Sequence, residues 1–261
     1  CNMHTIEEKK QAFERLLGIM DDLRSQCPWD KKQTMQTLRH LTIEEVYELT
    51  DAIMENELQE IKKELGDLIL HIVFYSKIAS ESNAFDIADV LNGICEKLIH
   101  RHPHIYGDVN VEDANEVIQN WEKLKLKEGN KSVLGGVPVS LPALVKAMRI
   151  QEKARAVGFD WENEHQVFEK VEEELKEFKA EVEHGDAQKA EDEFGDVLFA
   201  LVNYARFKNI NPEDALERTN KKFIRRFKFM EEKMKEQNLN FDSLSLTEMD
   251  VFWNQAKQNG L

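Results

Sequence analysis

One pattern indicates the fold, and it occurs twice: EEVYE at residues 44–48 with ELGDLILHIVFY at 64–75, then EELKE at 173–177 with EFGDVLFALVNY at 193–204. Equivalent positions are 129 residues apart throughout, so the acidic spacing is the same in both copies. Apolar residues in both copies recur at intervals of three and four, which is the period of an α-helix with one buried face. Self-similarity at a fixed offset is typical of a duplicated structural unit. The sequence therefore predicts an all-α fold built as a tandem repeat of two helical domains.

Helical spacing extends over almost the whole chain, and only 11 Gly and 5 Pro occur among 261 residues. A first apolar stripe runs from Phe13 to Leu23 and ends at Cys27-Pro28. Further helices are predicted at 42–56, 59–81, 86–101, 113–128, 142–157, 164–184, 187–208, 212–237 and 245–258. The segment richest in helix breakers is GNKSVLGGVPVSLP, so we expect a first domain at 1–128, a linker at 129–142 and a second domain at 143–261.

Charge and cysteine content restrict the partners of the chain. The formal net charge is −15, which repels nucleic-acid phosphates and anionic lipid, so neither nucleic acid nor a membrane is expected as a partner. The apolar runs are too short to span a bilayer. The three cysteines, Cys1, Cys27 and Cys95, form no CxxC motif, which is typical of a reducing compartment. We therefore expect a cytoplasmic protein.

The repeated acids are spaced as metal ligands on paired helices. Acids three residues apart share a helix face, and two such helices packed antiparallel bring four carboxylates together. Four clustered negative charges repel one another unless a cation binds them, and Mg²⁺ is the hard ion that takes carboxylate oxygens. The predicted Mg²⁺ ligands are Glu174, Glu177, Glu193 and Asp196 in the second copy; the first copy offers a second candidate metal site at Glu45, Glu48, Glu64 and Asp67.

Other readings of these acids remain open. A run of charges on a helix is often only a solvated face, and Thr42-Ile43-Glu44-Glu45 also fits a capping box with Thr42 as the cap. A di-iron bundle is a rival enzyme, but such sites need Glu-x-x-His on two helices, and both second motifs here end in Asp. A non-enzymatic scaffold on a decayed fold is the other rival. Gly66 and Gly195 lie inside helices, where we expect them to permit close backbone approach.

Basic and aromatic residues near the end of each copy are candidates for nucleotide contacts. Lys222 and Arg226 share a helix face, as do Lys97 and Arg101, and both residue types bind phosphate oxygens. Trp253 and Trp121 suit either base stacking or core packing. CPWD at 27–30 is interpreted as a helix stop with a buried Trp29, and HRHPH at 100–104 as a surface or interface loop.

Taken together, longer stretches resemble the MazG family: CPWDKKQT (27–34), LTIEEVYEL (41–49), HRHPHIYG (100–107), VGFDW (157–161), EEELKE (172–177), EFGDVLFALVN (193–203) and KFIRRF (222–227). This family comprises bacterial nucleoside triphosphate pyrophosphohydrolases of the all-α NTP pyrophosphatase superfamily. The resemblance implies a homodimer of tandem MazG-type domains, each a helical bundle completed by dimerisation. It also implies Mg²⁺-dependent hydrolysis of nucleoside triphosphates at the α–β bond to nucleoside monophosphate and pyrophosphate. A broad base range and a role in nucleotide-pool housekeeping are expected.

The resemblance assigns roles to residues of the second copy, which is regarded as the hydrolytic one in two-domain members. The implied metal ligands are the four acids already named, Glu174, Glu177, Glu193 and Asp196. The spacing of acids and bases adds a mechanistic hypothesis in which the catalytic residues are Glu173, Glu174, Glu193, Lys222 and Arg226. Glu173, next to Glu174 but turned about 100° around the helix, is either a group that supports the metal ligands or the base that orients the attacking water. The implied nucleotide contacts are Lys170, Val171, Glu172, Glu173, Glu174, Lys189, Ala190, Glu191, Asp192, Lys222, Phe223, Ile224, Arg225, Arg226 and Trp253.

The first copy lacks one of the phosphate-binding cations that the second copy has. Glu60 stands where the 129-residue offset places Lys189 of the second copy. An acid in place of a phosphate-binding cation weakens triphosphate binding, although the nearby Lys62 or Lys63 offers a substitute. The sequence therefore favours the second copy as the active one.

Overall fold

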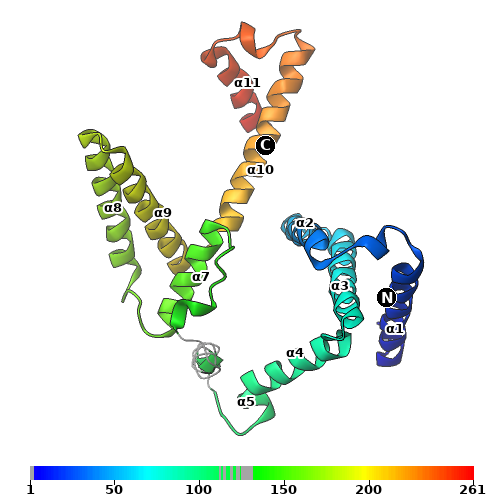
Figure 1. Cartoon of the computed structure of the whole chain (residues 1–261). Helices are drawn as coiled ribbons and strands as arrows, with labels where there is room; N and C mark the ends of the chain where they lie inside the picture. The colour runs from blue at the N-terminus through cyan, green and yellow to red at the C-terminus, as the bar shows by residue number, and fades with distance from the viewer. Residues whose placement is uncertain (1–2, 112, 114–115, 118–119, 122–123, 125–131) are drawn as a thin grey trace. The chain divides into compact units, whose positions relative to one another are not determined.

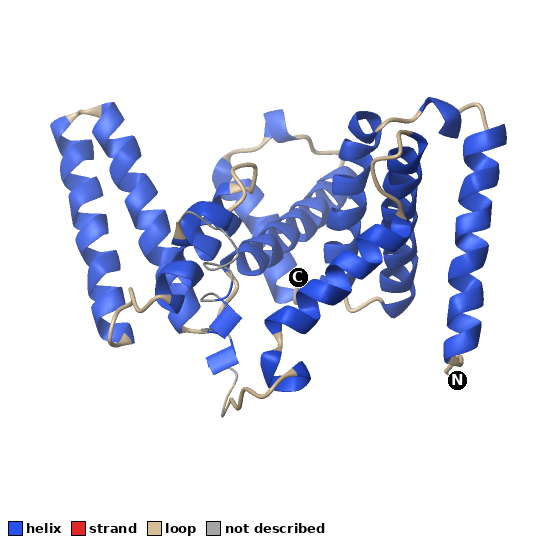
Figure 2. Cartoon of the chain, turned by 60° about the horizontal axis from the view of Figure 1, so that its bottom comes forward, coloured by secondary structure: helices blue, strands red, loops and turns tan. Residues whose placement is uncertain are grey.

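The computed structural model describes residues 3–111, 113, 116–117, 120–121, 124 and 132–261. These residues form helices, turns and loops, and no strand occurs among them (Figure 2). They divide into two compact units, with the division after Val111, and each unit holds one copy of the repeat (Figure 1). The predicted all-α tandem fold is confirmed.

The first unit is built around a long helical hairpin. Its elements are α1 (Ile6–Gln26), the 3₁₀ turn η1 (Asp30–Lys32), α2 (Met35–Met54), α3 (Leu58–Glu81), α4 (Ile87–Arg101) and α5 (Pro103–Tyr106). The short connection after Met54 folds α3 back along α2, with Asn56 in the left-handed region at φ 56°. The apolar core lies where α1 packs on this hairpin, around Met20, Leu38, Val73 and Phe74.

The second unit repeats the hairpin and adds two further helices. Its elements are η2 (Val133–Gly136), α7 (Ala143–Ala156), α8 (Glu164–His184), α9 (Ala187–Phe207), α10 (Pro212–Glu236), η3 (Phe241–Ser243) and α11 (Leu246–Gln258). The helix α7 packs on α9, and Gln151 of α7 donates to the backbone oxygen of Phe199 at 2.8 Å. The helices α10 and α11 share a separate apolar cluster around Met230, Met234 and Phe252.

The predicted helices agree closely with the structure, except at the start of α2. The prediction for 113–128 falls largely outside the described residues. The capping box predicted at Thr42 is wrong, because α2 begins seven residues earlier and Thr42 lies inside it. The cap is Thr34, whose hydroxyl accepts from the backbone N–H of Thr37 at 3.2 Å while Thr37 caps Thr34 in return. Leu38, in the added turn, is buried in the core, which explains the longer helix.

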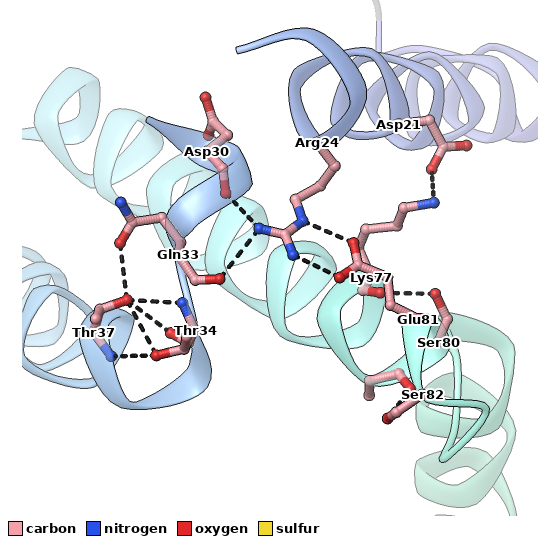
Figure 3. A network of polar contacts seen from close by, with 11 residues as sticks. Asp21, Arg24, Asp30, Gln33, Thr34, Thr37, Lys77, Ser80, Glu81 and Ser82 are labelled. Carbon is pink, nitrogen blue, oxygen red and sulfur yellow. Dashed lines mark hydrogen bonds and ion pairs between the residues drawn. The ribbon is translucent and has the colours of Figure 1, made fainter. Parts of the chain in front are cut away.

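The connection between α1 and α2 is held by polar contacts (Figure 3). The helix stop predicted at Cys27-Pro28 is confirmed, since α1 ends at Gln26. The buried tryptophan is wrong, because Trp29 is 55% exposed while Asp30 beside it is buried. Arg24 Nη1 donates to the backbone oxygens of Asp30 and Gln33, so this connection is tied to α1 on either side of the η1 turn.

Gly66 and Gly195 do not serve a close helix approach within this chain. A Cβ built on either glycine would meet no atom within 4 Å, so that prediction is wrong for the described residues. Both glycines are exposed among the described residues, next to the exposed Leu65 and Phe194. No helix in the described part of the chain is long and apolar enough to cross a membrane.

Candidate functional site

The hairpin α8–α9 sets the acids of the second copy opposite one another. Gly185 ends α8 with φ 79°, a left-handed conformation that glycine adopts at no steric cost. Asp186 then caps α9 by accepting from the backbone N–H of Lys189 at 3.1 Å. This tight reversal fixes the register of the two helices, so acids at the same height on each helix face one another.

Three of the four predicted ligands of the second copy lie together. Oxygens of Glu174, Glu177 and Glu193 all lie within 4.8 Å of one another. Glu174 is 8% exposed, Glu177 is exposed and Glu193 is half-buried, so this cluster opens to solvent on one side. Asp196 is exposed one turn further along α9, close enough for its charge to act on Glu193.

The electrostatics of this cluster are those of crowded like charges. The pKa of Glu193 is raised by desolvation, and further by the charges of Glu177, Asp196 and Glu174. Each of these causes disfavours the ionised carboxylate and is offset when a cation binds. The arrangement is suited to holding positive charge.

The first copy forms a matching cluster at the equivalent positions. Oxygens of Glu45, Glu48 and Glu64 also lie within 4.8 Å of one another. The pKa of Glu45 is raised by desolvation and by the charges of Asp67, Glu48 and Glu64, so Asp67 belongs to the same neighbourhood. Glu64 is only 3% exposed, and its Oε2 is enclosed without a hydrogen-bond donor.

Both clusters fit a hard divalent cation. Their donors are all carboxylate oxygens, which Mg²⁺ and Ca²⁺ prefer, and the enclosed Oε2 of Glu64 is a buried acceptor that a cation would satisfy. Neither group contains a histidine, so the described residues do not match the Glu-x-x-His ligands of a di-iron bundle. The acids of both copies are therefore drawn together by the fold rather than spread over a solvated face.

A lysine contacts the most buried acid of each cluster. Lys170 Nζ lies 2.8 Å from Glu174 and 3.1 Å from Glu173. The second contact holds Glu173, the predicted base, beside the cluster. Lys63 Nζ lies 2.9 Å from Glu64. The two lysines are not equivalent by sequence, since Lys170 precedes its acid on the first helix of its hairpin and Lys63 adjoins its acid on the second. Both pairs form within one helix, so spacing permits them, and only the burial of their acids in the structure distinguishes them from solvated pairs.

The other predicted nucleotide contacts on α8 and α9 surround the second cluster unevenly. Val171 is buried, so its side chain lies in the core. Lys189 lies at the start of α9 with its ammonium group 3.7 Å from Asp186. Glu172, Glu191 and Asp192 are exposed, and Ala190 is half-buried.

The residues predicted on α10 and α11 form a group of their own. Arg226 donates through Nε to the backbone oxygen of Leu261 at 2.7 Å, and its guanidinium lies 5.7 Å from the centre of the Trp253 ring. Phe223 packs on the same ring at 5.0 Å. Lys222, Ile224 and Arg225 are exposed. In the described part of the chain, no hydrogen bond or ion pair joins Lys222, Arg226 or Trp253 to the four carboxylates.

Sequence reasoning missed a polar group beside the first cluster. Thr42 Oγ1 lies 2.7 Å from His71 Nδ1 and 2.6 Å from Tyr75 Oη. His71 is buried, and desolvation lowers its pKa, which favours the neutral ring. The equivalent residues in the second copy are Val171, Ala200 and Tyr204. The signal was present, since a histidine interrupts an otherwise apolar helix face that the other copy keeps apolar.

Comparison with known protein families finds the same repeat. The MazG nucleotide pyrophosphohydrolase domain matches residues 33–106 and 162–230. These two matches contain the two acid clusters and fall in separate structural units.

Several characterised and uncharacterised proteins are similar along the chain. A nucleoside triphosphate pyrophosphohydrolase/pyrophosphatase MazG from Thermotoga maritima is 45% identical over 97% of this chain and 98% of its own length. A nucleoside triphosphate pyrophosphohydrolase from Escherichia coli K12 is 41% identical over 94% of this chain and 97% of its own length. The uncharacterized protein YabN from Bacillus subtilis is 47% identical over 97% of this chain but only 54% of its own length.

Proposed function

The chain belongs to the MazG nucleotide pyrophosphohydrolase family, and from this premise we propose that it is a nucleoside triphosphate pyrophosphohydrolase. It cuts the bond between the α and β phosphates and releases nucleoside monophosphate and pyrophosphate. The observation that carries this proposal is the cluster of Glu174, Glu177 and Glu193 within a family match that spans both of its helices.

Magnesium is the cofactor that we propose for this reaction. The ligands would be Glu174, Glu177 and Glu193, whose oxygens converge, together with Asp196, whose charge acts on Glu193. When bound, Mg²⁺ supplies positive charge that orients the phosphates and offsets negative charge developing in phosphoryl transfer. The four acids of the first copy, Glu45, Glu48, Glu64 and Asp67, are proposed as a second such site.

The chain's own groups would then position the substrate and the water. Glu173 lies beside Glu174 on α8, with more than half of its side chain exposed, and can accept a proton from the attacking water. Lys170, which pairs with Glu174, and Lys189, at the start of α9 beside Asp186, would hold the phosphates. Lys222 and Arg226 would bind the leaving pyrophosphate, with Trp253 stacked on the base. Stacking tolerates any base, which supports a broad base range and a housekeeping role in the nucleotide pool.

Homodimerisation is proposed because both hairpins leave the same apolar positions uncovered. Val46, Leu65, Ile69 and Ile72 of the first copy match Leu175, Phe194, Leu198 and Leu201 of the second, and all eight are exposed. Each hairpin thus exposes four large apolar side chains at equivalent positions, and clustered exposed apolar groups are typical of an interaction surface. A second copy of the chain covering these faces would complete each helical bundle. The net charge of −15 supports an enzyme without membrane or nucleic-acid partners, and three cysteines without a CxxC motif support a reducing, cytoplasmic compartment.

The second copy is proposed as the main active site. Lys189 is replaced by Glu60 in the first copy, and Glu60 lies 4.0 Å from Lys63, so it partly neutralises the cation that could substitute. This difference lowers the positive charge available for a triphosphate. We propose that residues 1–128 form the first domain, 129–142 the linker and 143–261 the second domain.

A substrate panel with paired variants tests the proposal. Purified protein is assayed with the common NTPs and Mg²⁺, and the products are resolved as pyrophosphate or orthophosphate. Glu193→Gln is expected to lower turnover by about a hundredfold or more, since it removes one metal ligand. Glu64→Gln should lose far less. Glu183→Gln, an exposed acid on α8 outside the cluster, is the matched control and should retain activity. Release of orthophosphate, or full turnover by Glu193→Gln, contradicts the proposal.

A further inference from the structure

In each cluster a lysine pairs with the most buried acid, Lys170 with Glu174 and Lys63 with Glu64. Lys170 contacts two acids at once, and the side chain of Glu174 is 10% exposed while that of Lys170 is 34% exposed. Such a half-shielded ion pair is screened less by water than a surface pair. The hydrogen bond to Glu174 raises the pKa of Lys170, so the ammonium group stays charged at any working pH.

An ammonium group and a divalent cation compete for this carboxylate. Both carry positive charge, and both are stabilised by the same oxygens of the most buried acid. If they bound side by side at Glu174, they would repel each other across a few ångströms in a partly desolvated site. The flexible four-carbon stem of lysine allows its charge to leave the carboxylate without a change in the backbone.

The first copy has the same contact through a different residue. Lys63 lies 2.9 Å from Glu64, which is the residue equivalent to Glu193, whereas Lys170 contacts Glu174, which is equivalent to Glu45. The positions equivalent to Lys170 and Lys63 hold Leu41 and Asp192. The lysines are therefore not a shared position of the repeat. What the two copies share is a lysine paired with the most buried acid. The pair lies on the second helix of the hairpin (α3) in the first copy and on the first helix (α8) in the second copy.

We propose that Lys170 and Lys63 are counter-ions that compete with the divalent cation for the buried carboxylate of each cluster. The inference rests on the proposed function, because it concerns access to the proposed metal sites. When the cation binds Glu174, the Lys170 ammonium group is released on the same helix face and becomes available to the triphosphate. Lys170 is thus a positioning residue that couples metal binding to nucleotide binding.

Manganese binding to the full chain tests the second copy. Mn²⁺ takes the same oxygen ligands as Mg²⁺ and is followed by electron paramagnetic resonance without any nucleotide. In a Glu64→Gln background, which disables the first cluster, Lys170→Met is expected to bind Mn²⁺ about three- to tenfold more tightly than its parent. A gain in affinity cannot arise from a damaged fold, and circular dichroism checks the fold directly.

Two control variants separate this effect from general charge. Lys170→Arg keeps a competing cation and should bind Mn²⁺ as the parent does. Lys179→Met removes an equal charge from an exposed i,i+4 pair with Glu183 on the same helix and should also leave the affinity unchanged. The mirrored arm uses Lys63→Met in a Glu193→Gln background. A smaller gain is expected there, because the Lys63 side chain is 60% exposed.

The outcomes distinguish the inference from the function on which it rests. If the parent binds Mn²⁺, loses it on Glu193→Gln, and Lys170→Met binds no more tightly, the competition is overturned while the metal site stands. If neither the parent nor Lys170→Met binds Mn²⁺, the metal site and the competition fall together. A gain in Lys179→Met equal to that in Lys170→Met also overturns the inference, since it assigns the effect to net charge.

Discussion

Arg24 of α1 and Glu81 at the end of α3 form a two-pronged salt bridge across 57 residues of chain, with Nε–Oε1 at 2.8 Å and Nη2–Oε2 at 2.6 Å. The same guanidinium donates to the backbone oxygens of Asp30 and Gln33 (Figure 3). One side chain therefore fixes the helix α1, its connection to α2 and the end of α3 together. Because α2 and α3 carry the first acid cluster, Arg24 also helps to hold the two helices of that cluster in place.

Replacing Arg24 by Met should destabilise the protein by about 1–3 kcal/mol, because Glu81 and the partly buried backbone oxygens of Asp30 and Gln33 lose their donor. Urea unfolding of both proteins at pH 7 measures the change. Lys10→Met, which removes an exposed pair with Glu7, should change stability by less than about 0.5 kcal/mol. Equal effects of the two substitutions would contradict the role assigned to Arg24.

The cost of Arg24→Met should depend on pH. The hydrogen bond from Arg24 lowers the pKa of Glu81 below its ordinary value of 4.5. A carboxyl group with a lowered folded-state pKa contributes its full stability above the unfolded value and loses it as pH falls through the folded value. The difference between wild type and Arg24→Met should therefore be largest above about pH 5 and shrink in more acidic buffer. Unfolding midpoints at pH 7 and pH 3 decide the matter.

Glu193→Gln should raise the melting temperature when divalent ions are removed by a chelator. Desolvation and neighbouring acids raise the pKa of Glu193, so its ionised form opposes folding at neutral pH. This penalty is absent below the ordinary value of 4.5, where the group is protonated in both states, so the two proteins should then melt alike. Melting scans at pH 7.5 and pH 4 test this, and a lower melting temperature for Glu193→Gln at pH 7.5 would refute it.

Thr42→Val should cost about 1–3 kcal/mol, because His71 Nδ1 and Tyr75 Oη lose their shared partner next to the core. The substitution keeps the shape of the side chain and copies Val171 of the second unit, so packing alone predicts little change. Chemical denaturation measures the loss. A nearly neutral Thr42→Val would mean that water replaces the hydroxyl.

Gly185→Ala should destabilise the α8–α9 hairpin by about 1 kcal/mol, since φ is 79° there and an added Cβ is disfavoured in the left-handed region. Gly18→Ala is the matched comparison: Gly18 lies in the exposed face of α1 with open space around its Cβ position. That change should stabilise the helix by about 1 kcal/mol. Opposite signs in thermal unfolding confirm the distinction.

Much of the fold was accessible from the sequence because helix periodicity is local. The boundaries of α3, α8 and α9 agree with the predicted ranges to within one residue, since apolar spacing and breakers both act over a few residues. The start of α2 was misplaced because two Thr-based caps compete within eight residues. The choice between them depends on whether Leu38 is buried, and that is a tertiary contact.

The candidate site was likewise predictable from the sequence only in part. The acids at 45, 48, 64 and at 174, 177, 193 were predictable as clusters because spacing of three on paired helices places them on facing sides. Spacing could not show that Trp29 is exposed, because exposure depends on which other segments pack over a residue, nor that Gly66 and Gly195 have open space at their Cβ positions. It also could not reveal the link between Thr42, His71 and Tyr75.

The sequence by itself determined that two helical hairpins each bring acids together, because periodicity and duplication are properties of the chain. Only the tertiary structure decided which acid of each cluster is the most enclosed, Glu64 at 3% exposure in the first and Glu174 at 8% in the second. Lys170 and Lys63 stand at unrelated positions of the repeat, yet each reaches the most buried acid of its hairpin. The physical reason is that each ion pair forms within one helix, whereas the burial of its acid depends on how the facing helix is rotated and packed, and spacing along one helix does not encode that packing.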